Sequence, residues 1–301
     1  MSESVPPSKR PSVIPAAIAV AAFASGCATS ARPAIRPAAA ADKTTVSRAP
    51  DERAERALAA GKLGVFNPPI ALAGQDDAVV RVVTHDSSCT GTLVADDLVL
   101  TAHHCVVERS QVAGTTRTHF STKLLEPKAF QVELGGDYLA WGSVRVKAIV
   151  APTCGESGGE GDLAILVLER KLVGVPTMQP RLSEPPKIGE PLDPIGFGRC
   201  ATSQGIKRNL RTGGPIRATT GETIEIVASV CPGDSGGPLV ARGSNQVVGV
   251  VSLSAMDGDE HTKAPSVMAR IDAFRQVFAH ARMIADGTPQ NELPPLSCNG
   301  L

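Results

Sequence analysis

The chain has 301 residues, with 30 Lys and Arg against 30 Asp and Glu, so its formal net charge is zero and its pI is about 7.0. Such a chain has no overall positive field, which argues against a nucleic-acid-binding protein or one held to membranes by a basic surface. Hydrophobic residues make up 42%, enough for a buried core, and the frequent Gly (29) and Pro (24) predict many turns. The seven cysteines are an odd number and include no C-x-x-C pair.

The first 27 residues have the pattern of an export signal. Lys9 and Arg10 precede a run of twelve mostly small apolar residues, 13–24 (VIPAAIAVAAFA). A membrane-spanning helix needs about 20 apolar residues, so this run has the length of a signal-peptide core instead. Residues 24–27 (ASGC) resemble the lipobox of bacterial lipoproteins, which implies that Cys27 is acylated and holds the protein to the membrane of the cell envelope. The alternatives are an ordinary secretory signal in which Cys27 has no role, and a protein that is not exported.

Residues 28–69 have a different composition. Ala, Pro and Arg dominate, prolines occur at Pro33, Pro37 and Pro50, and only residues 51–58 (DERAERAL) suit a short exposed helix. A stretch with so few large apolar residues cannot bury much surface. We therefore expect a flexible tether or a pro-segment here.

The folded domain is expected over residues 70–288, where short segments rich in β-branched residues alternate with Gly, Pro and Asp. These segments are residues 79–83, 92–94, 98–100, 130–134, 144–150, 163–168, 223–227 and 247–253. Several of them alternate in polarity with the period of two that a half-buried strand shows. Many short strands separated by turn residues predict an all-β sandwich or a pair of barrels.

One helix is predicted near the end of the chain. Its apolar residues recur at spacings of three and four: Ile271, Phe274, Val277, Phe278, Ala281 and Ile284. This spacing produces a single apolar stripe that can pack against the strands. Residues 289–301 form a polar, proline-containing tail.

Three segments carry residue types of nucleophilic catalysis, in the order His, Asp, Ser. Residues 89–93 (CTGTL) lead to 98–105 (LVLTAHHC), residues 161–166 read GDLAIL, and residues 231–240 read CPGDSGGPLV. A serine hydroxyl is a weak nucleophile until a base takes its proton, so a nearby histidine oriented by a carboxylate is required. Together the segments resemble the trypsin/chymotrypsin-like serine proteases over residues 70–285.

The resemblance implies an all-β fold of two antiparallel six-stranded β-barrels (chymotrypsin-like) with a C-terminal helix, and an active site between the barrels. It implies Ser235 as the nucleophile, His104 as the base and Asp162 as the residue that orients the imidazole. The backbone N–H groups of Gly233 and Ser235 would then form the oxyanion hole. The implied activity is endoproteolysis of protein or peptide substrates through an acyl-enzyme, without a metal or cofactor.

Neighbouring residues compete for two of these roles. The family places its base directly before a cysteine, which selects His104 and leaves His103 as a packed or partly exposed neighbour. Asp137 and Asp193 lack the strand-like residues that follow Asp162. Two other functions stay open: a catalytically silent homologue that acts as a surface binding or regulatory lipoprotein, and an esterase that uses the same triad.

Six cysteines remain once Cys27 is set aside, and we expect them to form three disulfides: Cys89–Cys105, Cys200–Cys231 and Cys154–Cys298. The first is the family disulfide that closes the loop carrying the histidine. The other two are the pairing that we favour among the three that four cysteines allow. Disulfides require an oxidising compartment, which is consistent with export.

The resemblance also bears on substrate preference. The base of the family's primary pocket lies six residues before the nucleophile and is Ser229 here, so a Lys or Arg side chain of the substrate would find no counter-charge. The pocket walls, which are glycines in the family, correspond to Ser254 and Ser266. Since serine narrows the pocket, we predict cleavage after small or medium neutral side chains.

Activation in the family depends on a new N-terminus. Cleavage frees an aliphatic residue that inserts beside the aspartate preceding the active serine, here Asp234, which is therefore expected to form a structural ion pair. Ile70 lies about where that residue belongs and follows Pro69. We expect a pro-segment ending near Pro69, removed by an activating protease, and this cleavage would also release the domain from a lipid at Cys27.

Overall fold

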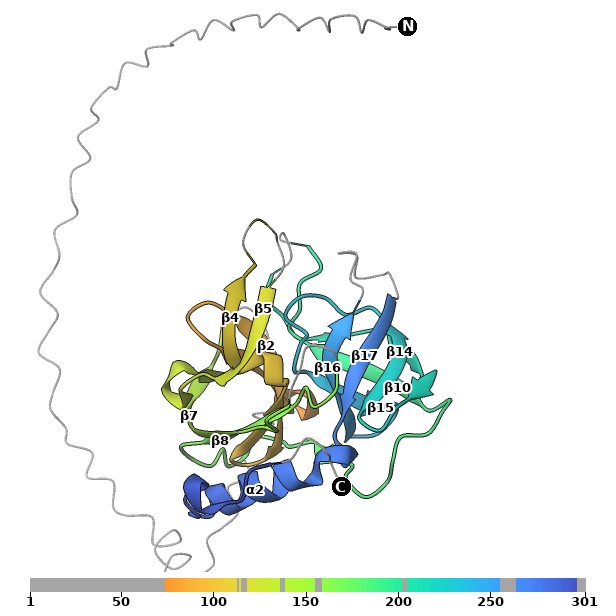
Figure 1. Ribbon diagram of the computed structural model, residues 1–301. Coiled ribbons are helices and arrows are strands. Elements are labelled where there is room, and N and C mark those ends of the chain that lie inside the picture. The colour runs from red at the N-terminus through yellow and green to blue at the C-terminus, as the bar shows by residue number, and fades with distance from the viewer. Residues whose placement is uncertain are drawn as a thin grey trace, which may run out of the picture. The chain divides into compact units, whose positions relative to one another are not determined.

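The computed structural model describes residues 74–112, 114, 118–135, 139–154, 159–201, 205–254 and 264–296. In this part of the chain the strands gather in two large sheets that lie side by side, and an α-helix covers one of them (Figure 1). The predictions for the export signal, Cys27, the tether, Ile70 and Cys298 concern residues outside the described ranges. Among the helices of the described residues, none has the length and apolar character to cross a membrane.

The first sheet is a closed antiparallel barrel. Its strands follow the order β1 (Val79–Val83), β2 (Ser88–Ala95), β3 (Leu98–Thr101), β8 (Ala164–Leu168), β7 (Gly142–Val150) and β6 (Gln131–Leu134). The barrel closes because β1 pairs with β6, with Val82 opposite Val132. Six of the predicted segments lie in these strands, so the short runs rich in β-branched residues located them correctly.

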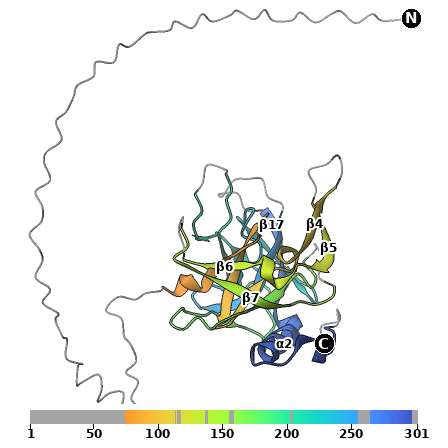
Figure 2. The ribbon, with the colours of Figure 1, turned by 90° about the vertical axis from the view of Figure 1, so that its left-hand side faces the viewer.

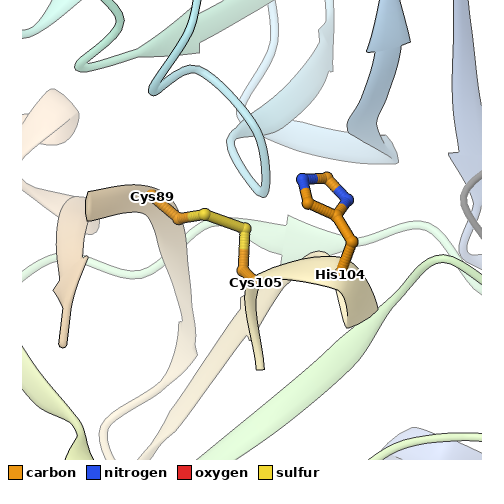
Figure 3. Close-up of side chains that lie close together, drawn as sticks. All are labelled: Cys89, His104 and Cys105. Carbon is orange, nitrogen blue, oxygen red and sulfur yellow. A yellow bond between two sulfur atoms is a disulfide. The ribbon is translucent and has the colours of Figure 1, made fainter. Parts of the chain in front are cut away.

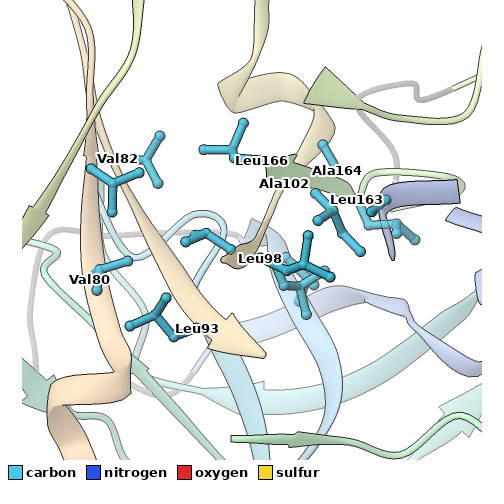
Figure 4. Packing of buried hydrophobic residues seen from close by; sticks show 14 of the residues in the cluster. Val80, Val82, Leu93, Leu98, Ala102, Leu163, Ala164 and Leu166 are labelled. Carbon is cyan, nitrogen blue, oxygen red and sulfur yellow. The ribbon is translucent and has the colours of Figure 1, made fainter. Parts of the chain in front are cut away.

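The interior of the first barrel is filled by aliphatic side chains from every strand. Val80, Leu93 and Leu166 are among the side chains that Figure 4 shows in the core, and all three are completely buried. β7 shows how the pattern arises, since Val146 is buried and the adjacent Lys147 is exposed. Fully burying one such aliphatic side chain contributes about 1.5–3 kcal/mol.

A two-stranded sheet extends from this barrel. It consists of β4 (Val107–Gln111) and β5 (Thr118–Leu124), and Figure 2 shows it projecting beyond the body of the domain. Most of its side chains are polar and exposed or half-buried, so its sequence shows little apolar alternation. Neither strand was predicted.

The second sheet has nine strands, five of which are long. These are β10 (Pro191–Gly196), β15 (Pro238–Ala241), β16 (Gln246–Ser254), β17 (Ala264–Arg270) and β14 (Thr223–Ala228), in that spatial order. The short strands are β9 (Gln179–Pro180), which pairs with β16, β11 (Asn209–Leu210) and β12 (Gly214–Pro215), which pair with β10, and β13 (Ala218–Thr219), which pairs with β14. The second sheet has its own hydrophobic core, in which Ile224, Leu239 and Met268 are completely buried.

The second barrel is less regular than predicted, because no continuous strand pairing closes it. β12 contains Pro215, which has no N–H to donate to a neighbouring strand. Hydrogen bonds from flanking residues join this segment to β14 instead: Ser229 N to Thr212 O at 3.0 Å and Arg217 N to Glu225 O at 2.9 Å. The ring of six strands is therefore completed by isolated hydrogen bonds on either side of β12.

The predicted C-terminal helix is α2 (Arg275–Ala285), and it packs on the outside of the first barrel (Figures 1 and 2). Its apolar stripe of Val277, Phe278, Ala281 and Ile284 is buried as the spacing predicts. A register shift in β7 between Val146 and Ala148 places Ile149 opposite Leu166, so Ile149 is buried on the same face as that core residue and not, as its spacing predicts, on the face of Arg145. α2 packs against β7 and β8.

An ion pair fixes α2 to the turn between β2 and β3. The two Nη atoms of Arg282 donate to the two carboxylate oxygens of Asp97, at 2.8 and 2.9 Å. Asp97 is buried, and the hydrogen bonds from Arg282 lower its pKa although burial opposes this shift. A carboxyl whose pKa is lower in the folded state stabilises that state above its unfolded pKa, and this contribution is lost as the pH falls through the folded pKa.

Replacing Arg282 by Met should therefore destabilise the domain in a pH-dependent way. We expect the Arg282→Met variant to lose about 1–3 kcal/mol of unfolding free energy at pH 7, because Asp97 is left buried without its partner. The difference should shrink as the pH is lowered from 7 toward 3, because protonation of Asp97 removes the charge with which Arg282 pairs. Urea unfolding at both pH values measures this, with Arg275→Met at an exposed position of the same helix as control. An equal loss at both pH values would contradict the role given to Asp97.

Candidate active site

His104 lies at the edge of the first barrel. β3 ends at Thr101, and the chain then forms a short 3-10 helix, His103–Cys105, that carries the imidazole. The disulfide between Cys89 on β2 and Cys105 ties this helix to the barrel, with the two Cα atoms 6.2 Å apart. Figure 3 shows the imidazole of His104 beside this disulfide. His103 is buried, so of the two alternatives it is packed and not partly exposed.

Asp162 is completely buried and contacts His104 twice. One carboxylate oxygen accepts from the backbone N of His104 at 2.9 Å, and the other lies 2.8 Å from Nδ1 of its ring. Burial raises the pKa of Asp162, but the attraction to His104 and the hydrogen bonds to the carboxylate outweigh this, so the pKa lies below its ordinary value. An ionised carboxylate can only accept, so Nδ1 carries the hydrogen and Nε2 of the neutral ring is left as an acceptor.

Ser252 on β16 is a third partner of this carboxylate. Its Oγ donates to the same oxygen of Asp162 that faces the His104 ring. The sequence prediction missed this residue, because a serine within a strand is a weak signal without knowledge of the strand's neighbours. The only hint was its position two residues before the predicted pocket residue Ser254.

Ser235 lies on the loop between β14 and β15, in the second half of the domain. It shares a cleft of about 640 Å³ with His104 and Gly233. The carbonyl of Ser235 accepts from the backbone N of Thr90 at 2.8 Å, which connects the loop to β2 of the first barrel. The structure thus brings all three predicted triad residues to one region: Asp162 bonds to His104, and His104 and Ser235 line the same cleft.

The loop leaves two backbone donors available at this cleft. The N–H groups of Gly233 and Ser235 donate no hydrogen bond to any other residue in the described part of the chain. Gly233 has a φ of +102°, a conformation that favours glycine. The preceding carbonyl, that of Pro232, accepts from Arg199 N at 3.0 Å. Since C=O and N–H point in opposite directions across a trans peptide, this bond fixes the direction of the Gly233 N–H.

Thr90 holds the other side of Gly233. Its side chain is completely buried, and its Oγ1 donates to the carbonyl of Gly233 at 2.6 Å and accepts from the backbone N of Phe197 at 3.0 Å. One hydroxyl on the first barrel therefore binds two segments of the second sheet. The sequence prediction quoted Thr90 only as part of the Cys-Thr-Gly-Thr segment and gave it no role.

Asp234 forms the structural ion pair that the sequence predicted, but its partner differs from the expected one. Arg211 donates from Nε to Asp234 Oδ2 at 2.8 Å, and both side chains are buried. Backbone N–H groups of Gly198 and Cys231 donate to the two carboxylate oxygens at 2.7 and 2.8 Å. Burial raises the pKa of Asp234, and Arg211 and these N–H groups oppose the shift. A Cβ at Gly198 would lie 2.5 Å from the carboxylate, so glycine is needed there.

In the uncleaved chain Arg211 holds the place beside Asp234 that a freed N-terminus is expected to take. The carboxylate already receives two backbone N–H groups and the Arg211 guanidinium, so an incoming ammonium group would have to displace Arg211. Ile70, the residue expected to insert, lies outside the described residues. Arg211 carried no sequence signal, since it follows β11 in a segment without a recognised motif.

Two of the three expected disulfides lie within the described residues. Besides Cys89–Cys105, Cys200 pairs with Cys231, with their Cα atoms 5.0 Å apart. Cys154 is also disulfide-bonded, and its expected partner Cys298 lies outside the described ranges, so that pairing stays a prediction. Among the described residues, the one His/Cys/Asp/Glu group close enough to share a metal ion is His104 with the first disulfide, whose sulfurs are not thiolates.

The three predicted pocket serines lie at one end of the second sheet. Ser254 on β16 pairs in register with Ser266 on β17, and their Oγ atoms are 2.7 Å apart. Ser229 follows the last residue of β14, the other neighbour of β17. It is buried, and its Oγ accepts from the backbone N of Thr212 at 3.2 Å. The segment 255–263 between the two wall serines lies outside the described residues.

Asp193, one of the two competing aspartates, takes no part in this site. Asp193 forms a two-point ion pair with Arg242, with both N–O distances at 2.7 Å. Asp137 lies outside the described residues. Asp162 is thus the predicted aspartate that bonds to His104.

Comparison with known proteins gives one family match. The family described as Trypsin matches residues 71–278. Phenoloxidase-activating factor 1 of Holotrichia diomphalia is 26% identical over 228 residues, an alignment that covers 62% of this chain and 60% of that protein, less than two thirds of its length. Proproteinase E of Bos taurus is 27% identical over 213 residues, covering 62% of this chain and 80% of the relative. Among solved structures, mouse neuropsin has 20% identity and a TM-score of 0.49, covering 69% of this chain and 95% of that one.

The role of Thr90 can be tested through the reactivity of Ser235. Thr90→Val keeps the shape but removes the hydroxyl that holds Gly233, so we expect it to slow phosphonylation of Ser235 by a fluorophosphonate about tenfold. The Thr90→Ser variant, which retains the hydroxyl, should react at close to the wild-type rate.

Mass spectrometry of the adduct gives the rates, and urea unfolding shows whether each variant is folded. If a folded Thr90→Val protein reacts as fast as the wild type, the hydroxyl does not position this loop.

Proposed function

The chain belongs to the trypsin family, and on this premise we propose that it is a serine endopeptidase that hydrolyses peptide bonds through an acyl-enzyme. The observation that carries the proposal is the buried carboxylate of Asp162, bonded to Nδ1 and to the backbone N of His104. It is supported by the cleft that His104 shares with Ser235 and Gly233.

Each residue has a defined task in the proposed reaction. Ser235 Oγ attacks the carbonyl carbon of the substrate while Nε2 of His104 takes its proton, and Asp162 stabilises the imidazolium that forms. The negative charge on the carbonyl oxygen is bound by the N–H groups of Gly233 and Ser235. His104 then gives its proton to the leaving amine, and water releases the acyl group by the same steps.

The geometry of the pocket serines supports a preference for small or medium neutral residues before the cleaved bond. Ser229 supplies no negative charge for a Lys or Arg side chain of the substrate. Ser254 and Ser266 add two hydroxyls, hydrogen-bonded to each other, where the family has glycines. A large aromatic side chain would have to displace this pair.

Asp234 already forms an ion pair with Arg211 in the uncleaved chain, so we expect the enzyme to be active before any cleavage near residue 70. Arg211 already occupies the position beside Asp234 where a freed N-terminus would bind. Removal of the preceding segment by an activating protease would then affect location and not activity. This is the part of the proposal that departs from the sequence prediction.

Export to the bacterial cell envelope completes the proposal and rests on the sequence. The signal-like residues 1–27 with Cys27, and disulfides that need an oxidising compartment, support a lipid-anchored or secreted protease. Its substrates would be proteins or peptides outside the cytoplasm.

Covalent labelling and peptide hydrolysis test the catalytic assignment. We expect a fluorophosphonate to modify Ser235, and Ser235→Ala to abolish both labelling and hydrolysis of a casein-derived peptide mixture while the protein stays folded. His104→Ala should lower the hydrolysis rate by at least about a thousandfold, because the base is lost. A folded wild-type protein that neither reacts with the probe nor cleaves any peptide would refute the proposed function and favour a silent homologue.

The narrow pocket leads to a second measurement. The double variant Ser254→Gly, Ser266→Gly should raise kcat/KM for peptides with Phe before the cleaved bond relative to those with Ala, by about tenfold or more. The wild type should prefer Ala or Val over Phe, Lys and Arg. A strong wild-type preference for Lys or Arg in a peptide panel would show that the pocket is assigned wrongly.

A further inference from the structure

Three arginines line the cleft beside Ser235, and their charges are only partly compensated. From this we propose that the cleft binds an acidic side chain of the substrate on the leaving-group side of the cleaved bond. The inference rests on the proposed protease function and names a class of substrate for it.

The position of the cleft identifies which part of a substrate would occupy it. From Ser235, Gly233 and His104 it extends to Ser88 and Cys89 on β2, on the side of the first disulfide. Its lining includes none of the three pocket serines, which lie at the end of β14, β16 and β17. If the residue before the cleaved bond enters the pocket formed by the three serines, the residues after the bond would therefore lie in this cleft.

The charges in the cleft are unbalanced. Among the described residues that line it, Arg81, Arg109 and Arg199 face one carboxylate, that of Asp86. Asp86 is exposed and lies 2.5 Å from the ring of His85. Arg81 is paired with Glu133 outside the cleft at 2.9 Å. Arg109 and Arg199 form no ion pair with any carboxylate in the described part of the chain, so two guanidinium groups remain uncompensated.

Arg109 is positioned next to the proposed catalytic base. Its Nη2 donates to the carbonyl of His104 at 3.2 Å, and its guanidinium carbon lies 5.4 Å from the centre of the Phe120 ring. That ring in turn meets the His104 ring edge-on at 5.2 Å. Stacking orders the long side chain in advance, which reduces the entropy that binding a carboxylate would cost. Its remaining N–H groups can donate to an anion.

Arg199 approaches from the other half of the domain. Its backbone N binds the carbonyl of Pro232, which fixes the residue beside the Gly233 loop, and its side chain is exposed. Arg109 lies on β4 and Arg199 follows β10, so the two charges that line the cleft come from different sheets. An Asp or Glu among the first three residues after the cleaved bond would meet one or both, and guanidinium groups favour carboxylates because they can donate two parallel hydrogen bonds.

Internally quenched peptides that differ at one position test the proposal. All the peptides have the same residues before the cleaved bond. Glu, Gln or Lys is placed in turn at the first, second or third position after this bond. We expect kcat/KM to be about tenfold higher for Glu than for Gln at one of these positions, and lower still for Lys. The preference should weaken in high salt.

Variants show whether the arginines cause the preference. Arg199→Ala should reduce the Glu/Gln ratio toward one, and Arg199→Glu should reverse the order of Glu and Lys. Arg145→Ala, an exposed arginine on β7 outside the cleft, should leave the ratio unchanged. A wild-type enzyme that cleaves the Glu, Gln and Lys peptides equally, or a ratio that Arg199→Glu does not alter, overturns the inference.

A nitroanilide substrate with the same acyl side and no residue after the bond separates this inference from the proposed function. If it is hydrolysed while the peptides show no preference, the acidic site is absent and the protease function stands. If neither substrate type is hydrolysed and Ser235 does not react with a fluorophosphonate, the proposed function itself fails and the inference falls with it.

Discussion

The buried carboxylate of Asp234 is the constraint around which the active-site loop is built. A charge in the interior is tolerated only when it is paired and hydrogen-bonded, and here Arg211 and the N–H groups of Gly198 and Cys231 supply that environment. Because Arg211 and Gly198 lie on segments outside the loop, the loop cannot move away from them without leaving a charge unpaired, which costs about 3–5 kcal/mol. The neighbouring residues Gly233 and Ser235 are thereby left with unused N–H groups at the cleft.

The site depends equally on contacts between the two halves of the domain. Thr90 on the first barrel binds the carbonyls of Gly233 and Ser235, and Ser252 on the second sheet binds Asp162. None of these bonds is needed to form either sheet. Their effect is to set the position of one half relative to the other, which is the geometry that an acyl transfer between a serine and a histidine requires.

The sequence allowed some of this to be predicted and not the rest, for identifiable reasons. Residues in a regular pattern or a contiguous motif could be located, such as the apolar stripe of α2, the barrel strands and the segments around His104 and Ser235. Arg211, Thr90 and Ser252 could not, because their partners lie 23, 143 and 90 residues away and nothing local marks them. The strands β4 and β5 were not predicted because their mostly polar sequences show no alternation of apolar and polar residues. The irregular closure of the second barrel was not predicted because it follows from Pro215, which has no N–H to donate to a neighbouring strand.

We infer that internal contacts assemble the active site, with Arg211 beside Asp234 in place of a freed N-terminus. The most direct measurement compares the rate at which a fluorophosphonate modifies Ser235 in the intact chain and in the same chain cut between Pro69 and Ile70 at an engineered site. Mass spectrometry would verify both N-termini. We expect equal rates for the two forms, and a loss of reactivity in the intact Arg211→Met variant. Labelling that appears only after the cut would contradict this inference.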